Sequence, residues 1–160
     1  MFDFIVYALA IPLITGLLAL WVKNPVTVSW MNVAASSATA GTLFWLVRLL
    51  VAAGPFQQGI FLLDSLNAVF LLIVGFLSFT AALYSFPYMN HELQAGHVTA
   101  KMIPRYYAMF QFFVLTMIFT LVVENLGLLW VAVEATTLVS ALLVAYYLNR
   151  SSLEAAWKYV

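Results

Sequence analysis

The sequence contains no cysteine and very little charge. The absence of cysteine excludes disulfide bonds, iron–sulfur ligation and thiolate chemistry. Only 8% of the residues are charged, against about 25% in an average soluble domain. Six lysines and arginines balance six aspartates and glutamates, so the chain lacks the basic excess with which nucleic-acid binders contact phosphates. A soluble globular domain and a nucleic-acid binder are therefore both excluded.

What the sequence does contain is long apolar runs. Apolar residues make up 66% of the 160 residues, and the mean hydropathy is +1.05. A helix needs about 20 mostly apolar residues to cross a bilayer core, and the runs show none of the period-two alternation of an outer-membrane barrel. We predict an all-α polytopic membrane bundle with five complete transmembrane helices and the start of a sixth. The expected helices cover about 4–22, 28–53, 66–86, 107–123 and 126–148, and the sixth covers 152–160.

The connectors between these helices are short. Residues 56–63 are too few to span a membrane and are expected to form a strand-like or re-entrant piece. Asp64 and Asn125 stand where N-caps of the third and fifth helices belong. The longest predicted loop, 87–105, holds His91 and His97. It is either an ordinary solvated loop or one end of a metal site, but two ligands do not complete such a site. We therefore predict no metal and no cofactor in this chain.

The placement of lysine and arginine predicts the orientation, because cytoplasmic loops of membrane proteins carry an excess of these residues. The bases of the first, third and fifth connectors are Lys23, Lys101, Arg105 and Arg150. The opposite side carries Asp3 and Glu124 instead. We expect an N-terminus on the periplasmic side of the cell inner membrane. Arg48 lies inside the second helix, where three roles stay open: interfacial anchor, intramembrane counter-ion, or contact to lipid headgroups.

Glu134 is the most informative residue for function. It lies eight residues past the start of the fifth apolar run, roughly 12 Å at 1.5 Å per residue, and so close to mid-membrane. A charge there costs at least ~2.5–3.5 kcal/mol, so the side chain is either neutral or paired across the bundle. Thr137 and Ser140 extend a polar stripe that we expect to face inward. A proton or ion relay is the favoured interpretation, and a glutamate that only hydrogen-bonds two helices is the alternative.

Two further charged positions accompany Glu134. Lys158 lies about 9 Å into the sixth helix, one turn after Glu154. It is either half of an i,i+4 ion pair or a desolvated amine that responds to a neighbouring carboxylate. In the second case, an acid and a base in adjacent helices would pass protons by exchanging partners. Glu124 precedes the fifth helix. Its negative charge either interacts favourably with the positive N-terminal end of that helix or marks a proton exit.

Several segments together resemble the antiporter-like, proton-conducting membrane subunits. This family spans the large membrane subunits of respiratory complex I, the Mrp-type sodium/proton antiporters and the membrane arms of energy-converting hydrogenases. The similar segments are 105–113, 124–126 and 130–134 (WVAVE), followed by 134–140 (EATTLVS) and 152–160 (SLEAAWKYV). The last two are most similar to component F of hydrogenase-4 complexes of the formate-hydrogenlyase type.

The resemblance implies roles for individual residues. Glu134 matches the family's glutamate in the fifth helix, and Lys158 matches a lysine early in the sixth helix. Family members conduct protons across the inner membrane, while neighbouring membrane and peripheral subunits carry out electron transfer. They hold no redox cofactor of their own. The resemblance therefore implies a non-redox subunit of an oxidoreductase complex, with no catalytic centre in this chain.

Length is where this sequence departs from the family. Its members resemble bundles of about fourteen helices built from inverted repeats with discontinuous helices. Because the sequence stops nine residues into the sixth helix, we expect residues 1–160 to be the N-terminal part of a longer proton-translocating domain. Two other functions stay open: a sodium/proton antiporter subunit, and a non-enzymatic membrane scaffold that binds partner subunits through its helices.

Overall fold

The computed structural model describes residues 1–147 and 150–159. The described chain is almost entirely helical, with α1 (Phe2–Ala19), α2 (Pro25–Ala53), α3 (Ser65–Gln94), α4 (Ile103–Val122), α5 (Leu126–Val144), the 3-10 turn η1 (Ala145–Tyr147) and α6 (Arg150–Tyr159). The first five helices are long and apolar enough to cross a membrane. The predicted all-α, multi-pass membrane fold is confirmed. Residues 148 and 160, the predicted ends of the fifth and sixth helices, lie outside the described residues.

Side-chain caps fix where three of these helices begin. Asp64 accepts hydrogen bonds from the backbone N–H groups of Leu66 and Asn67, both at 2.9 Å. Asn125 accepts from two backbone N–H groups at the start of α5, at 2.9 and 3.1 Å. Both predicted caps are confirmed. Asn24 caps α2 in the same way, with Pro25 in the first helical turn, where its missing N–H is not needed.

A short β-hairpin joins α2 to α3. Strand β1 (Phe56–Gln58) pairs antiparallel with β2 (Phe61–Leu63). Gly59 takes the first position of the two-residue turn with φ of +63°, a conformation that glycine adopts without steric cost. Of the two structures expected for residues 56–63, the strand-like one is therefore present.

The predicted long loop at 87–105 is wrong over most of its length. Helix α3 continues through Pro87 to Gln94, and α4 already begins at Ile103. The continuation is stabilised by tertiary packing, because Met89 is buried and Leu93 packs beside it in the hydrophobic cluster at this end of the bundle. The intervening connector is therefore only eight residues long, from 95 to 102.

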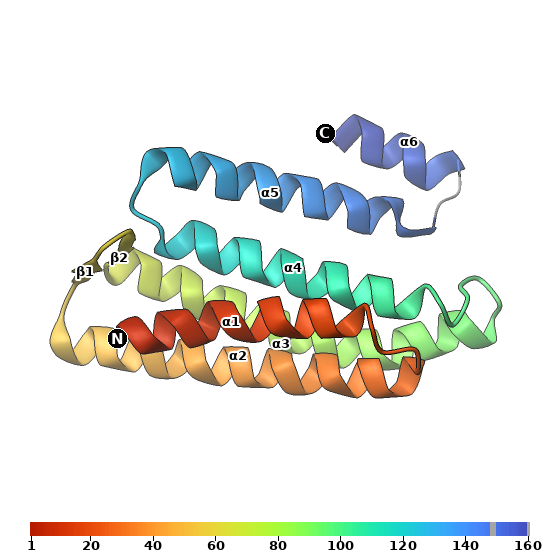
Figure 1. The fold of residues 1–160 in the computed structure, drawn as a ribbon, viewed down its shortest axis with the longest axis horizontal. Helices are drawn as coiled ribbons and strands as arrows, with labels where there is room; N and C mark the ends of the chain where they lie inside the picture. The colour runs from red at the N-terminus through yellow and green to blue at the C-terminus, as the bar shows by residue number, and fades with distance from the viewer. Residues whose placement is uncertain (148–149, 160) are drawn as a thin grey trace.

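Helices α1 to α4 form one packed bundle, and α5 lies along its side (Figure 1). Buried side chains of α1, α2, α3 and α4 form the main core, among them Ile5, Leu43, Leu71 and Ile118. Gly16 lets α1 approach α4 closely, because a Cβ at this position would lie 2.8 Å from the ring of Phe112. Helix α5 packs on α4, and α6 folds back over α5.

Candidate functional site

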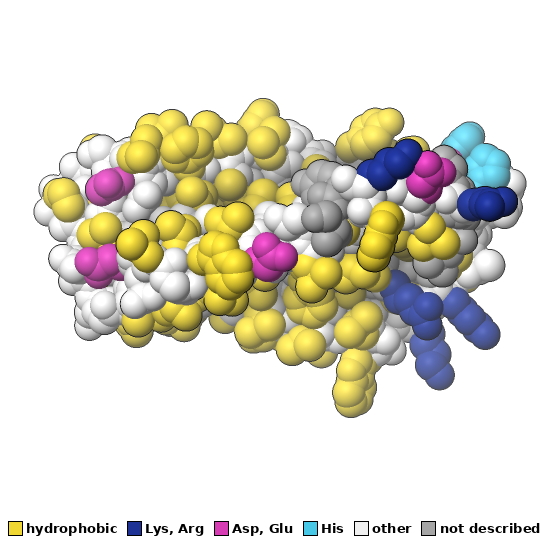
Figure 2. Space-filling model, turned by 90° about the horizontal axis from the view of Figure 1, so that it is seen from above, with side chains coloured by type: hydrophobic (Ala, Val, Ile, Leu, Met, Phe, Trp, Pro, Cys, Tyr) yellow, Lys and Arg dark blue, Asp and Glu magenta, His cyan; other side chains and the backbone are white. Residues whose placement is uncertain are grey.

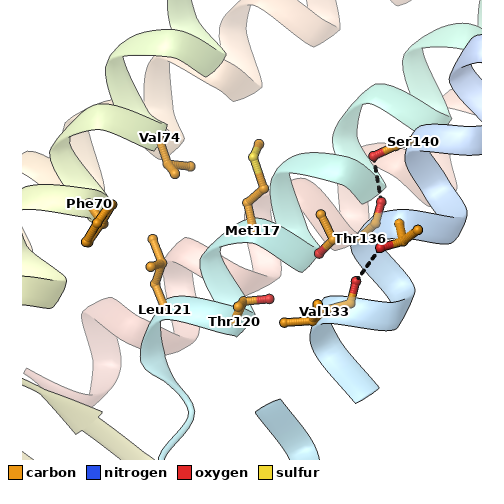
Figure 3. Close-up of a pocket in the computed structure, with 9 residues that line it drawn as sticks. Phe70, Val74, Met117, Thr120, Leu121, Val133, Thr136 and Ser140 are labelled. Carbon is orange, nitrogen blue, oxygen red and sulfur yellow. Dashed lines mark hydrogen bonds between the residues drawn. The ribbon is translucent and has the colours of Figure 1, made fainter. Parts of the chain in front are cut away.

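A groove between α3, α4 and α5 is the first feature of the candidate site. Its volume is about 280 Å³. Most of its lining is apolar, and the polar part consists of hydroxyl groups from α4 and α5. The lining residues are Phe70, Val74, Met117, Thr120, Leu121, Val133, Thr136, Thr137 and Ser140. Figure 3 shows these side chains gathered around the space between the three helices.

The hydroxyl groups of the groove all donate to backbone carbonyls of their own helix. Thr136 donates to Ala132 O at 2.9 Å, Thr137 to Val133 O at 3.1 Å and Ser140 to Thr136 O at 2.7 Å. The last two bonds are drawn in Figure 3. A hydroxyl that has donated its hydrogen keeps oxygen lone pairs as acceptors. The groove therefore offers acceptor oxygens, suited to water or a small cation, in an otherwise apolar wall.

Glu134 does not line this groove. It is the ninth residue of the 19-residue helix α5, directly after Val133, which lines the groove. Its side chain is exposed, as are Trp130 and Val131 on the same helix. The expected inward stripe is therefore present for Thr137 and Ser140 but not for Glu134. A carboxyl group at mid-helix on an outward face needs either a proton or a covering partner in a membrane.

The structure does not bring Lys158 to Glu134. The Lys158 ammonium lies 2.6 Å from a carboxylate oxygen of Glu154, and both side chains are exposed. Within residues 1–147 and 150–159, Glu134 makes no ion pair within 4.0 Å. The i,i+4 ion pair foreseen as one role of Lys158 is thus present in the structure. Partner exchange between Lys158 and Glu134 stays a prediction.

Glu124 connects the start of α5 to the hairpin. Its carboxylate accepts a hydrogen bond from Gln57 Nε2 at 2.6 Å, and its backbone N–H donates to Ile60 O at 2.9 Å. An isolated bridge between Phe61 and Val123 continues the contact. These bonds give Glu124 a structural role at this end of the bundle. Its role as a proton exit stays a prediction.

Arg48 and His97 contact other side chains. The guanidinium of Arg48 lies 5.6 Å from the centre of the Trp45 ring, and its exposure suits an interfacial anchor. His97 Nδ1 lies 3.3 Å from Glu92 Oε2, which also accepts a hydrogen bond from the hydroxyl of Tyr147. His91 lies in the last turn of α3. Among the residues that the structure describes, no three His, Cys, Asp or Glu side chains form a possible metal site.

The two ends of the bundle differ in charge: one end carries Lys23, Lys101 and Arg105 together with Glu92 near the end of α3, and the other end carries acidic residues at the starts of helices. Because successive helices run antiparallel, the first and third interhelical connectors meet at one end (Figure 1). Figure 2 shows Lys, Arg and His side chains gathered at that end of the visible face beside an acidic group, while the charged side chains visible at the other end are acidic. The acidic end holds Asp3, Asp64 and Glu124, in the first turn of α1 and at the starts of α3 and α5.

Sequence reasoning missed a polar cluster buried between α2 and α4. Gln111 Nε2 donates to Asn32 Oδ1 at 2.8 Å and to Ser36 Oγ at 3.2 Å. All three side chains are at most 1% exposed. The spacing of Ser29, Asn32, Ser36 and Thr39 in an otherwise apolar segment was the available signal, since these positions fall on one face of a helix. The cluster joins α2 to α4 by hydrogen bonds between side chains that are buried inside the bundle.

The sequence is similar to subunits of respiratory membrane complexes. Residues 58–97 match a family described as NADH-ubiquinone oxidoreductase (complex I), chain 5 N-terminus. Over 132 residues, 82% of this chain, the sequence is 39% identical to a hydrogenase-4 component F homolog of Methylacidiphilum infernorum, of which it covers 27%. Over 96 residues, 60% of this chain, it is 38% identical to NADH-ubiquinone oxidoreductase chain 5 of Mytilus edulis, of which it covers 16%.

A solved structure shares the fold. A chain of the membrane-bound sulfane sulfur reductase, an archaeal respiratory membrane complex, superposes with a TM-score of 0.78 at 21% identity. The superposition covers 97% of this chain and 33% of that chain. The chain thus spans about a quarter of the length of the component F relative, for which the covered share is 27%. These findings confirm the family resemblance predicted from the sequence.

Proposed function

Because the chain is related in sequence to hydrogenase-4 component F and to chain 5 of complex I, we propose that it is a proton-translocating membrane subunit. Residues 1–160 form the N-terminal part of its transmembrane domain. The observation that carries the proposal is Glu134, a carboxyl group at the midpoint of membrane helix α5, the same helix whose Thr136, Thr137 and Ser140 hydroxyls line part of the groove. Membrane and peripheral partner subunits supply the redox energy.

The proposed chemistry is proton exchange at Glu134. Thr136, Thr137 and Ser140 present acceptor oxygens to water in the groove, and water there exchanges protons with the carboxyl group. Ionised Glu134 attracts the ammonium of Lys158, and neutral Glu134 releases it to Glu154. A change in electric field from the partner subunits then shifts the proton occupancy of Glu134. Each proton that Glu134 accepts from one side is released toward the other.

Replacing Glu134 tests this proposal. In the complete protein within its membrane complex, Glu134→Gln should lower coupled proton movement at least tenfold, because an amide cannot take up and release a proton at neutral pH. The measurements are proton flux in sealed vesicles and the yield of assembled complex. Asp3→Asn, a carboxyl-to-amide change at the exposed start of α1, is the matched control and should leave both unchanged.

The outcome also separates the two alternatives. Unchanged flux per assembled complex in Glu134→Gln, together with a lower yield of complex, would favour the scaffold function. Flux that requires sodium in the wild-type protein would instead favour a sodium/proton antiporter subunit. Wild-type flux that is independent of sodium, and is lost in Glu134→Gln with normal assembly, supports proton translocation.

The orientation is a second proposal, and it rests on the charge difference between the two ends of the bundle. We place the basic end in the cytoplasm and the N-terminus in the periplasm of the inner membrane. Because the chain has no native cysteine, single introduced cysteines report sidedness without background. A cysteine at residue 97 should react with a membrane-impermeant maleimide only after the cells are opened, and one at residue 3 should react in intact cells. The reverse pattern would contradict the orientation.

A further inference from the structure

A hollow at the basic end of the bundle is lined by basic side chains that have no role in the proposed function. It lies between the end of α1 with its connector and the start of α4, two segments about 80 residues apart that meet because α1 packs against α4. Its volume is about 470 Å³. The residues that line it are Leu20, Val22, Lys23, Lys101, Pro104 and Arg105.

The charge of this hollow is entirely positive. Lys23, Lys101 and Arg105 line it, and no acidic side chain does. In the part of the chain that the structure describes, the two ion pairs within 4.0 Å are Glu92–His97 and Glu154–Lys158. None of the three cations is paired with a carboxylate among these residues. Three cations around one hollow repel one another. An anion bound between them removes that repulsion.

The start of α4 adds to the positive potential. The residue before the helix, Met102, has no side-chain group that caps the first turn. The N–H groups of a first helical turn have no partners within the helix, and the helix dipole places partial positive charge at this end. Arg105 lies in the same turn. Pro104 in this turn has no N–H, so an anionic group in the hollow meets the three side-chain charges and the positive end of the helix dipole.

The remaining wall of the hollow is apolar, and this decides the class of ligand. Leu20, Val22 and Pro104 complete the lining. Leu13 and Leu17 extend the exposed apolar surface from Leu20 along α1, at a spacing that keeps the three leucines on one face. A free phosphate would use only the cations. A phospholipid uses both parts, with its phosphate among the cations and its acyl chains along α1.

The position along α1 also suits a lipid headgroup. Trp21, next to the hollow, is 85% exposed. Tryptophan is enriched where membrane proteins cross the interface between hydrocarbon and water. Lys23 is two residues further along the chain than Trp21, beyond the end of α1. The three cations therefore lie at headgroup depth, while the leucines lie at the depth of the acyl chains.

We propose that this hollow binds one anionic phospholipid, with its phosphate held by Lys23, Lys101 and Arg105 and its acyl chains along the Leu13–Leu17–Leu20 face of α1. The site is separate from Glu134 and does not depend on proton translocation. Bound lipid joins the start of α4 to the end of α1 by neutralising charges from both segments.

Native mass spectrometry of the full chain in detergent tests the proposal, with phosphatidylglycerol as the probe. Phosphatidylcholine of the same acyl chains tests the need for net negative charge, and inorganic phosphate tests the need for acyl chains. Phosphatidylglycerol should bind at least tenfold more tightly than phosphatidylcholine, and inorganic phosphate at equal concentration should not displace it. Equal binding of the two lipids would overturn the proposal, and displacement by inorganic phosphate would show a free-anion site instead.

Variants locate the site. A basic residue near a membrane surface strengthens binding to anionic lipid roughly fivefold, so the triple variant Lys23→Gln, Lys101→Gln, Arg105→Gln should bind phosphatidylglycerol on the order of 100-fold more weakly. Arg150→Gln, at the same end but outside the hollow, is the matched control and should weaken binding by less than the roughly fivefold expected for a cation that lines the hollow. Equal losses in Arg105→Gln and Arg150→Gln would mean that only the general charge of this end matters.

A charge-conserving variant covers the case in which the triple variant misfolds. Lys23→Arg with Lys101→Arg keeps all three positive charges, and should bind phosphatidylglycerol within about threefold of the wild-type chain because the attraction is mainly electrostatic. A loss of binding in this variant, with unchanged circular dichroism, would contradict the assignment of the phosphate to these side chains.

Discussion

The α1–α4 bundle and helix α5 differ in how much of their apolar surface is buried within this chain. Side chains of the first four helices bury one another, and the bundle encloses leucines, isoleucines and the hydrogen-bonded Asn32–Gln111 pair. Helix α5 is just as apolar, yet only Ala132 and Ala141 of its described side chains are buried. Its candidate functional residue, Glu134, lies on an exposed face. The bundle is thus the stable support, and α5 is the helix whose surface is open to a partner.

The comparison also shows how α5 is attached. Apart from its packing on α4, it is held at its two ends by polar contacts. At the acidic end, Glu124 binds Gln57 of the hairpin. At the basic end, the hydroxyl of Tyr147 lies 2.8 Å from that of Tyr88 and donates to Glu92 Oε2 at 3.2 Å. Movement of α5 relative to the bundle therefore requires these end contacts to break before the core does.

The largest predicted difference concerns one leucine from each region. Leu43 of α2 is 0% exposed, whereas Leu138 of α5 is 56% exposed. Leu43→Ala leaves a cavity in the core and should lower the free energy of unfolding by about 1–3 kcal/mol; this is below the range for water-soluble cores because lipid is as apolar as leucine. Leu138→Ala should change it by less than about 0.5 kcal/mol.

Unfolding of the full chain in mixed micelles by titration with sodium dodecyl sulfate, followed by circular dichroism, measures both variants. Similar losses of stability in Leu43→Ala and Leu138→Ala would show that the α5 face is packed as tightly as the core. That result would contradict the division between bundle and open helix.

A smaller effect is predicted for the contact at the basic end of α5. Tyr147→Phe removes the hydroxyl that bonds Tyr88 and Glu92 but keeps the ring. The free energy that holds the end of α5 against the bundle should fall by about 0.5–1.5 kcal/mol, and the stability of the core should not change. Hydrogen–deuterium exchange should therefore accelerate in the last turn of α5 and stay unchanged in α2. Tyr7→Phe, at an exposed position of α1, is the control; faster exchange in both variants would mean that the contact to Glu92 has no specific role.

Sequence patterns located the elements better than they located the ends of α3 and α4. The five apolar runs, the caps at Asp64 and Asn125 and the strand-like segment all depend on local chemistry that the sequence displays directly. The helical stretch 87–94 was missed because it begins with Pro87 and its residues are polar enough for a loop. Burial of Met89 against α4 and its neighbours makes this stretch helical, and such packing is visible only in three dimensions.

For the candidate site, too, the sequence predicted some features and the tertiary structure decided others. Its depth was determined by the sequence, because the rise of a helix fixes Glu134 at the middle of α5 once the ends of the apolar run are known. The hydroxyls of Thr137 and Ser140 were likewise identified from their spacing. The exact orientation of α5 was decided only by the tertiary structure: the sequence placed Glu134, Thr137 and Ser140 on one inward stripe, but packing on α4 turns Thr137 and Ser140 toward the groove and leaves Glu134 exposed. For the same reason the sequence displayed Gln111 and Asn32 but not their hydrogen bond, which exists because packing makes α2 and α4 neighbours.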